Sequence, residues 1–280
     1  MKENLDKEYK LEKSSSSSEE EGEEKNKKDE IKEENKSSFQ KFMDSIRGSI
    51  SDKPNPLSQD KDRTIEEIIT SKGFKVEKHF VKTEDGYTLT IFRIPGGKNC
   101  LDVDKNPPVL FQHGIFDSSD GWVCNGEKHS IPFIFANNNF DVWLSNSRGN
   151  KYCKSHDNFD NTSFEFWQFS FHEMGIYDIP AVIKYIFSIN KSGEKIIYFG
   201  HSQGTSLMFS GLTQKFNFYQ KYIKLFVALA PVARLANIGS ALLSILSKIS
   251  IHKLVKKIKI HEIAPSNKLT TNFLSFIKDT

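Results

Sequence analysis

The stretch KIIYFGHSQGTSLMF, residues 195–209, decides the fold because it joins an apolar, strand-like run to a helix-like run through one serine. That serine, Ser202, lies between Gly200 and Gly204. A strand that turns at once into a helix needs a tight corner, where side chains at the flanking positions would collide. The pattern predicts a nucleophile elbow, in which the Ser202 hydroxyl projects above a sheet and faces the amino end of the following helix.

A nucleophilic serine needs two N–H donors for the negative charge that develops on the substrate oxygen. The Gln203 amide, at the start of the expected helix, is one candidate. The second is expected from a loop after an earlier strand, and the stretch LFQHGIFDSSDGW (110–122) provides one. There Gly114 allows close approach of the chain, so we expect the Ile115 amide to complete the oxyanion hole.

Three polar residues near these motifs are interpreted as structural. We expect His113 to hold its loop by hydrogen bonds, and we expect His201 to point away from the elbow. Arg148, in NSRGN, carries a planar fork of donors that suits loop anchoring. Contact with substrate is the less favoured alternative for Arg148.

Apolar runs alternate with segments of helical spacing along most of the chain. The expected strands fall within 107–114, 140–149, 195–204 and 224–233, after a hairpin at 75–97. The expected helices fall at 64–74, 130–139, 166–190 and 205–220, the first capped by Thr64 and Glu67. This alternation predicts an α/β fold with a mostly parallel sheet and with chemistry at the carboxyl edge of the strands.

Composition changes sharply along the 280 residues. Residues 1–36 contain 13 acidic residues and 9 lysines, a net charge of −4, and almost no apolar side chain. We therefore expect a disordered charged tail over 1–60. The net charge of +3 is too small to indicate nucleic acid.

Six motifs in order resemble the acid lipase family of α/β-hydrolases, which includes gastric and lysosomal lipases and steryl ester hydrolases. They are TEDGYTLTIFRIP, LFQHGIFDSSDGWV, FDVWLSNSRGNKYCKSH, FWQFSFHEMGIYDIPAVIKYI, IIYFGHSQGTSLMF and ALAPVAR. The resemblance implies Ser202 as the acylated nucleophile and the amides of Ile115 and Gln203 as the oxyanion hole. It also implies triacylglycerols or steryl esters as substrates, and no cofactor. By the same resemblance, residues 64–232 are expected to form the first part of an α/β-hydrolase core and residues 233–280 the start of a helical cap. The three cysteines show no metal-ligand spacing, so no metal is expected.

The remainder of a catalytic triad cannot be drawn from this sequence. In α/β-hydrolases an acid and then a histidine follow the serine, whereas here the acids Glu262 and Asp279 do not precede His252 or His261. We therefore expect a chain that stops within the cap. The amino-terminal residues also show no basic stretch followed by an apolar run, so no secretory signal is recognised and the compartment is not assigned.

The segment after residue 235 combines apolar residues at near-helical spacing with five lysines between 248 and 259. Such a helix either lies in a lipid interface or packs as a cap with solvated lysines. Two other functions stay open beside the lipase. One is an inactive lipid-binding or interaction protein that keeps the fold, and the other is a hydrolase of thioesters or small soluble esters.

Overall fold

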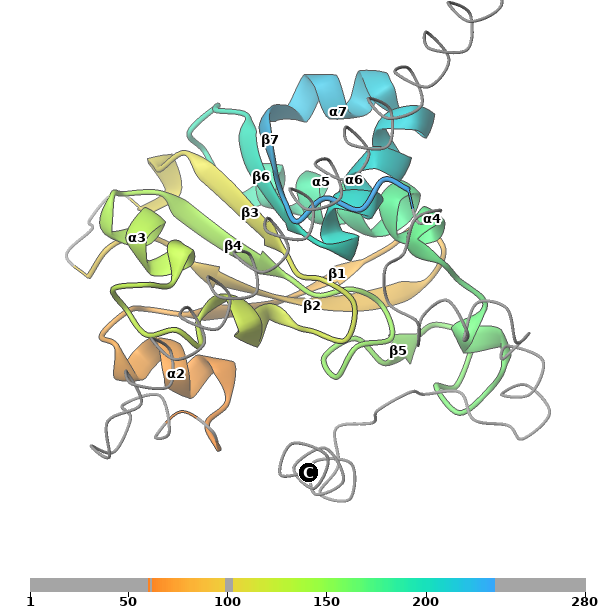
Figure 1. Cartoon of the computed structure of the whole chain (residues 1–280), viewed down its shortest axis with the longest axis horizontal. Helices are drawn as coiled ribbons and strands as arrows, with labels where there is room; N and C mark the ends of the chain where they lie inside the picture. Colours follow the sequence, from red (N-terminus) through yellow and green to blue (C-terminus); the bar gives the residue numbers. More distant parts are fainter. Residues whose placement is uncertain (1–59, 61, 99–102, 235–280) are drawn as a thin grey trace, which may run out of the picture. The chain divides into compact units, whose positions relative to one another are not determined.

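The computed structural model of the chain describes residues 60, 62–98 and 103–234. Within these residues one mixed sheet has the strand order β1-β2-β4-β3-β6-β7, and the short β5 pairs with β2 (Figure 1). The strands are β1 (Glu77–Lys82), β2 (Tyr87–Ile94), β3 (Pro108–Gln112), β4 (Asp141–Ser145), β5 (Ser155–His156), β6 (Ile196–His201) and β7 (Ile223–Leu229).

Four strands, β4, β3, β6 and β7, run parallel to one another, and β1, β2 and β5 pair antiparallel. The helices are α2 (Ile65–Ser71), α3 (Ile131–Asn137), α4 (Phe171–Glu173), α5 (Ile179–Ile189), α6 (Gln203–Gln214) and α7 (Phe216–Tyr222). Single turns are η2 (Val103–Lys105), η3 (Ser119–Trp122), η4 (Glu165–Trp167) and the π-helical η5 (Met174–Asp178). The predicted α/β fold with a mostly parallel sheet is confirmed.

Each face of the sheet has its own apolar core. On one face, side chains of α5, α6 and α7 pack on sheet residues that include Leu110, Trp143 and Tyr198. On the other face, α2 and α3 cover sheet residues that include Phe111, Leu144 and Phe199. Because successive side chains of a strand point to opposite faces, β3 and β4 contribute to both cores and are buried throughout.

The first elements form as their local sequence predicts. Thr64 caps α2 in a capping box, in which its hydroxyl accepts from the Glu67 N–H and the Glu67 carboxylate accepts from the Thr64 N–H. β1 and β2 form the expected hairpin, and Gly86 in its turn has φ +98, a conformation that favours glycine.

Two expected helices are divided in the structure. Over 166–190 the chain forms η4, α4, η5 and α5 in succession, because Ser170 caps a new helix and Pro180 has no N–H to donate to the carbonyl four residues earlier. Over 205–220 the helix ends at Lys215, where α6 gives way to α7. Tyr219 packs there against Gly211, and its hydroxyl donates to the Gly175 carbonyl at 2.5 Å.

The strand β7 differs from the other parallel strands in burial. We expected a buried strand, but its residues are half-buried or exposed, and Leu225 is 52% exposed. Among the described residues only β6 pairs with it, which explains the exposure.

Several sequence-based expectations fall outside the described residues. They are most of the tail over 1–60, nearly all of the cap over 233–280, and Cys100. The two cysteines that the structure describes are free thiols, Cys124 exposed and Cys153 buried. Within the described ranges, no helix combines the length and apolar character needed to cross a membrane.

Candidate active site

A sharp corner between β6 and α6 carries Ser202. The strand ends at His201, the helix begins at Gln203, and Ser202 alone joins them with φ 51 and ψ −116. Its N–H donates to the Leu229 carbonyl of β7 at 2.9 Å, and its carbonyl accepts from the Thr205 N–H at 2.9 Å and from the Thr205 hydroxyl at 2.6 Å. Backbone contacts on both sides therefore hold a non-glycine residue in a conformation that costs free energy.

The glycines on either side of this corner are required by space. A Cβ on Gly200 would lie 2.8 Å from the carbonyl carbon and oxygen of Gly204. A Cβ on Gly204 would lie 2.6 Å from the Gln112 carbonyl oxygen and 2.9 Å from that of His113. These neighbours are backbone atoms and cannot rotate away. The elbow geometry expected from the spacing is therefore present, and it presses α6 against the end of β3.

The loop after β3 also reaches the serine. A Cβ on Gly114 would lie 3.1 Å from the Ser202 Cβ, so the absence of a side chain lets the loop approach the corner. Ile115 follows directly, and its side chain is 55% exposed. The structure thus brings together the segments that contain Ser202, Gln203 and Ile115. The use of the two amides as an oxyanion hole stays a prediction.

His113 is buried and makes hydrogen bonds through both ring nitrogens. Its Nε2 lies 3.1 Å from the Ser147 N–H and 3.2 Å from Asn150 Nδ2, and its Nδ1 lies 2.7 Å from the Gly114 carbonyl oxygen. A main-chain N–H can only donate, so Nε2 accepts and Nδ1 carries the proton. Burial lowers the pKa of His113, which favours this neutral form. These bonds give His113 the loop-holding role expected from the sequence.

His201 lies nearer to this loop than the sequence indicates. Its side chain is exposed, but its Nδ1 lies 3.2 Å from the position that a Cβ of Gly114 would take. Its ring also meets Trp122 edge-on, with 6.4 Å between the ring centroids. The ring therefore packs beside the β3 loop rather than away from the elbow.

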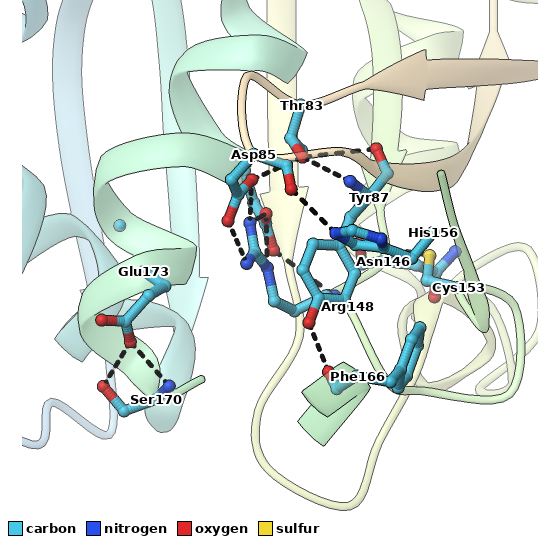
Figure 2. Close-up of polar contacts among 12 residues, drawn as sticks. Thr83, Asp85, Tyr87, Asn146, Arg148, Cys153, His156, Phe166, Ser170 and Glu173 are labelled. Carbon is cyan, nitrogen blue, oxygen red and sulfur yellow. Dashed lines mark hydrogen bonds and ion pairs between the residues drawn. The ribbon is translucent and has the colours of Figure 1, made fainter. Parts of the chain in front are cut away.

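Arg148 anchors the loop after β4, as expected (Figure 2). Its Nη1 and Nη2 donate to the Asp85 carboxylate at 2.6 and 2.9 Å, and its Nε and Nη2 donate to Asp178 Oδ1 at 2.9 and 2.5 Å. The guanidinium also lies 4.0 Å from the centre of the Tyr87 ring. One buried cation therefore joins the β1–β2 turn, the β4 loop and the π-helical turn η5.

Charge in this cluster is unevenly balanced, since two carboxylates share one guanidinium. Burial raises the pKa of Asp178 to about 6, and the Arg148 charge opposes that rise. Burial would also raise the pKa of Asp85, but hydrogen bonds from Arg148 and Thr83 bring it below its ordinary value. Asp178 is therefore the carboxylate that neutralises first from neutral pH downward.

Sequence reasoning missed several residues that hold the site. The most connected is Asn146, whose Nδ2 donates to the Thr90 carbonyl and to the Ser119 hydroxyl, both at 3.0 Å. Its Oδ1 accepts from the Ser119 N–H at 2.9 Å and from Asn150 Nδ2 at 2.8 Å. The sequence signal that could have indicated Asn146 is its place at the end of an apolar, strand-like run, which puts it at the carboxyl edge of the sheet. Thr205 and Asp178 carried no comparable signal.

No base for the serine is found among the described residues. The Ser202 hydroxyl makes no hydrogen bond there, and the nearest histidines in sequence are otherwise engaged. His172 Nδ1 lies 3.2 Å from the Ser210 hydroxyl, and His201 packs beside Gly114. His252 and His261, considered from the sequence, lie outside the described residues.

Comparison with known families agrees with this geometry. A family described as "alpha/beta hydrolase fold" matches residues 107–248, which is half of the chain, and a "partial alpha/beta-hydrolase lipase region" matches residues 65–126. The chain belongs to the α/β-hydrolase fold family. The resemblance to acid lipases that the motifs carry agrees with the lipase-region match over residues 65–126.

Curated lipases are similar to part of the chain. The lysosomal acid lipase/cholesteryl ester hydrolase of Homo sapiens is 45% identical over 174 residues, which are 61% of this chain and 43% of that protein. The gastric triacylglycerol lipase of Rattus norvegicus is 43% identical over 180 residues, 64% of this chain and 45% of that lipase. Lipase member K of Mus musculus is 43% identical over 171 residues, 60% and 42% of the two chains.

The α/β-hydrolase chain described here therefore spans less than half the length of the curated relatives that it matches. The family match over residues 107–248 includes the serine corner and the loop after β3.

Proposed function

We propose that this α/β-hydrolase chain carries the nucleophile of a serine ester hydrolase that acts on lipid esters, triacylglycerols or steryl esters. One observation carries the proposal: Ser202 occupies a strained corner with φ 51, between a strand and a helix, where glycines leave room for the backbone on both sides. Strain of this kind persists where the surrounding structure over-determines it, which is typical of active sites.

In the proposed reaction Ser202 Oγ attacks the carbonyl carbon of the ester, and the carbonyl oxygen becomes an oxyanion. The N–H groups of Ile115 and Gln203 donate to that oxyanion. The tetrahedral intermediate collapses, the alcohol leaves with a proton, and an acyl group remains on Ser202. Water then releases the fatty acid. We propose that the base that takes the Ser202 proton lies outside the described residues, as the chain order of α/β-hydrolases implies.

Apolar side chains beside the corner support a lipid substrate. Ile115 and Phe116 follow Gly114 and are 55% and 76% exposed. Exposed apolar residues next to a reacting serine suit an acyl chain better than a polar alcohol or a peptide. Two of the similar proteins are a triacylglycerol lipase and a cholesteryl ester hydrolase, which supports the same class of substrate. We propose residues 64–232 as the first part of the catalytic core and 233–280 as the start of its cap. Contact with a lipid interface is part of the same proposal.

The test is covalent labelling by a fluorophosphonate, which forms a bond from Ser202 Oγ to phosphorus as fluoride leaves. Mass spectrometry of the labelled chain should find the adduct on Ser202, and Ser202→Ala should lose it. Ser206→Ala is the matched control, because Ser206 lies on α6, the helix that follows Ser202, and its hydroxyl donates to the Val232 carbonyl at 2.7 Å. An unlabelled chain that still binds lipid vesicles would support the inactive lipid-binding alternative.

A further inference from the structure

The peptide unit between Gly114 and Ile115 contains two groups that matter to the proposed site. Its N–H, from Ile115, is the proposed second oxyanion donor, and its carbonyl, from Gly114, accepts from His113 Nδ1 at 2.7 Å. A peptide unit is planar, so its C=O and N–H point in opposite directions. A contact that fixes the Gly114 carbonyl therefore fixes the direction of the Ile115 N–H.

We infer that His113 is a positioning residue for the oxyanion hole: its Nδ1–H holds the Gly114 carbonyl so that the Ile115 N–H faces the oxyanion. This inference rests on the proposed function. His113 touches no reacting atom and acts through the Gly114–Ile115 peptide.

The other contacts of His113 keep its Nδ1 protonated, so that it can donate to the Gly114 carbonyl. The Ser147 N–H at 3.1 Å and Asn150 Nδ2 at 3.2 Å leave Nε2 as an acceptor, so the ring has its proton on Nδ1. His113 is 4% exposed, and burial lowers its pKa, so the ring stays neutral into mildly acidic solution. Donation from Ser147 also polarises the ring and strengthens the Nδ1–H bond to Gly114.

The loop after β4, which contains Ser147, is itself held by contacts with other parts of the protein. Ser147 precedes Arg148, whose guanidinium is held by Asp85 and Asp178. The loop after β4 is therefore fixed to the body of the protein, and through it the ring of His113. A chain of contacts thus runs from a buried ion cluster to the peptide that faces Ser202.

Two substitutions of His113 distinguish the role of Nδ1 from the role of Nε2. His113→Asn places a side-chain amide nitrogen about where Nδ1 lies, so it can still donate to the Gly114 carbonyl. His113→Gln places its terminal atoms about where Nε2 lies, so it can accept from the Ser147 N–H but loses the donor to Gly114. If His113 only fills space or holds the β4 loop, Gln should be the better replacement. If it positions the oxyanion peptide, Asn should be.

The measurement is the rate constant of fluorophosphonate labelling at saturating probe, with the half-saturating concentration measured in parallel. The phosphoryl oxygen takes the place of the oxyanion, so a misdirected Ile115 N–H should slow bond formation and leave probe binding unchanged. We expect His113→Gln to lower the rate constant by about 10- to 100-fold, below the loss expected for a deleted oxyanion donor. We expect His113→Asn to stay within about 3-fold of the unsubstituted chain.

A second readout does not depend on reactivity. Nitrogen-15 shifts of the His113 ring should report protonated Nδ1 and unprotonated Nε2. The opposite tautomer would overturn the inference, and so would equal labelling rates in the unsubstituted chain and His113→Gln. Failure of the unsubstituted chain to label at Ser202 would instead overturn the proposed function, and the role of His113 with it.

Discussion

Gly204 faces the Gln112 carbonyl so closely that a Cβ on Gly204 would lie 2.6 Å from that oxygen. This contact joins the first turn of α6 to the carboxyl end of β3. It sets the distance between the Ser202 corner and the loop that holds Gly114, and so it determines whether Ile115 and Gln203 can face the same oxygen atom.

We therefore predict that Gly204→Ala both destabilises the fold and slows labelling of Ser202. The added methyl group meets two backbone carbonyls, so the helix must shift, at a cost of about 2–3 kcal/mol. Urea unfolding and fluorophosphonate labelling measure the two effects.

Gly193→Ala is the control, because nothing lies within 4 Å of its Cβ position although its φ is +73. It should cost about 1 kcal/mol of stability and leave labelling unchanged. Equal effects of both variants on labelling would contradict the prediction.

The backbone conformation of Ser202 should lower the free energy of unfolding. Its φ of 51 with ψ of −116 is a conformation that only glycine adopts without strain. We predict that Ser202→Gly unfolds at higher urea concentration than Ser202→Ala, although both lack the nucleophile. Relief of strain, about 1–3 kcal/mol, exceeds the about 0.5–1 kcal/mol that a glycine adds to the entropy of the unfolded chain. If Ser202→Ala proved equally stable or more stable, the corner would hold no strain.

The corner could be predicted from sequence because its signals are local. Gly200, Ser202 and Gly204 lie within five residues, and the apolar runs on either side have the periods of a strand and a helix. The loop of Gly114 was found for the same reason, since a glycine directly after a buried strand indicates close approach. The α/β class follows from the alternation of apolar runs, whereas the strand order, in which β4 lies between β2 and β3, was not predicted.

Contacts between distant segments could not be predicted in this way. Arg148 was interpreted correctly as an anchor, but its partners Asp85 and Asp178 come from a hairpin turn and from a π-helical turn. The expected continuous helix over 166–190 gave no sign of that turn. The tautomer of His113 depends likewise on the N–H of Ser147, which follows another strand.

Loss of Arg148 should destabilise the chain far more than loss of an exposed cation. Arg148→Met leaves two carboxylates without their shared donor, and we expect a cost of about 3 kcal/mol in the free energy of unfolding. Asp178→Asn in the same chain should recover part of this cost, because it removes a buried charge.

Lys184→Met is the matched control. Lys184 pairs at 2.8 Å with Glu84, next to Asp85, but both groups are exposed. We therefore expect Lys184→Met to lower the free energy of unfolding by less than about 1 kcal/mol. Equal costs for the two variants would show that Arg148 is not an anchor.

The Asp178 carboxyl predicts how stability depends on pH. Its pKa in the folded chain, about 6, lies above the ordinary 3.8 that it takes in the unfolded chain. Between these values the folded state binds the extra proton, so the contribution of Asp178 to the free energy of unfolding falls as pH rises from about 4 to about 6. The lowered pKa of Asp85 acts in the opposite direction and below this pH range, since the contribution of Asp85 to the free energy of unfolding is lost as pH falls through 3.8 and below.

Urea unfolding of the unsubstituted chain and of Asp178→Asn across pH 4 to 7 measures the contribution of Asp178. The two curves should diverge with rising pH up to about 6 and then run parallel, and parallel curves throughout would show that Asp178 does not titrate in this window.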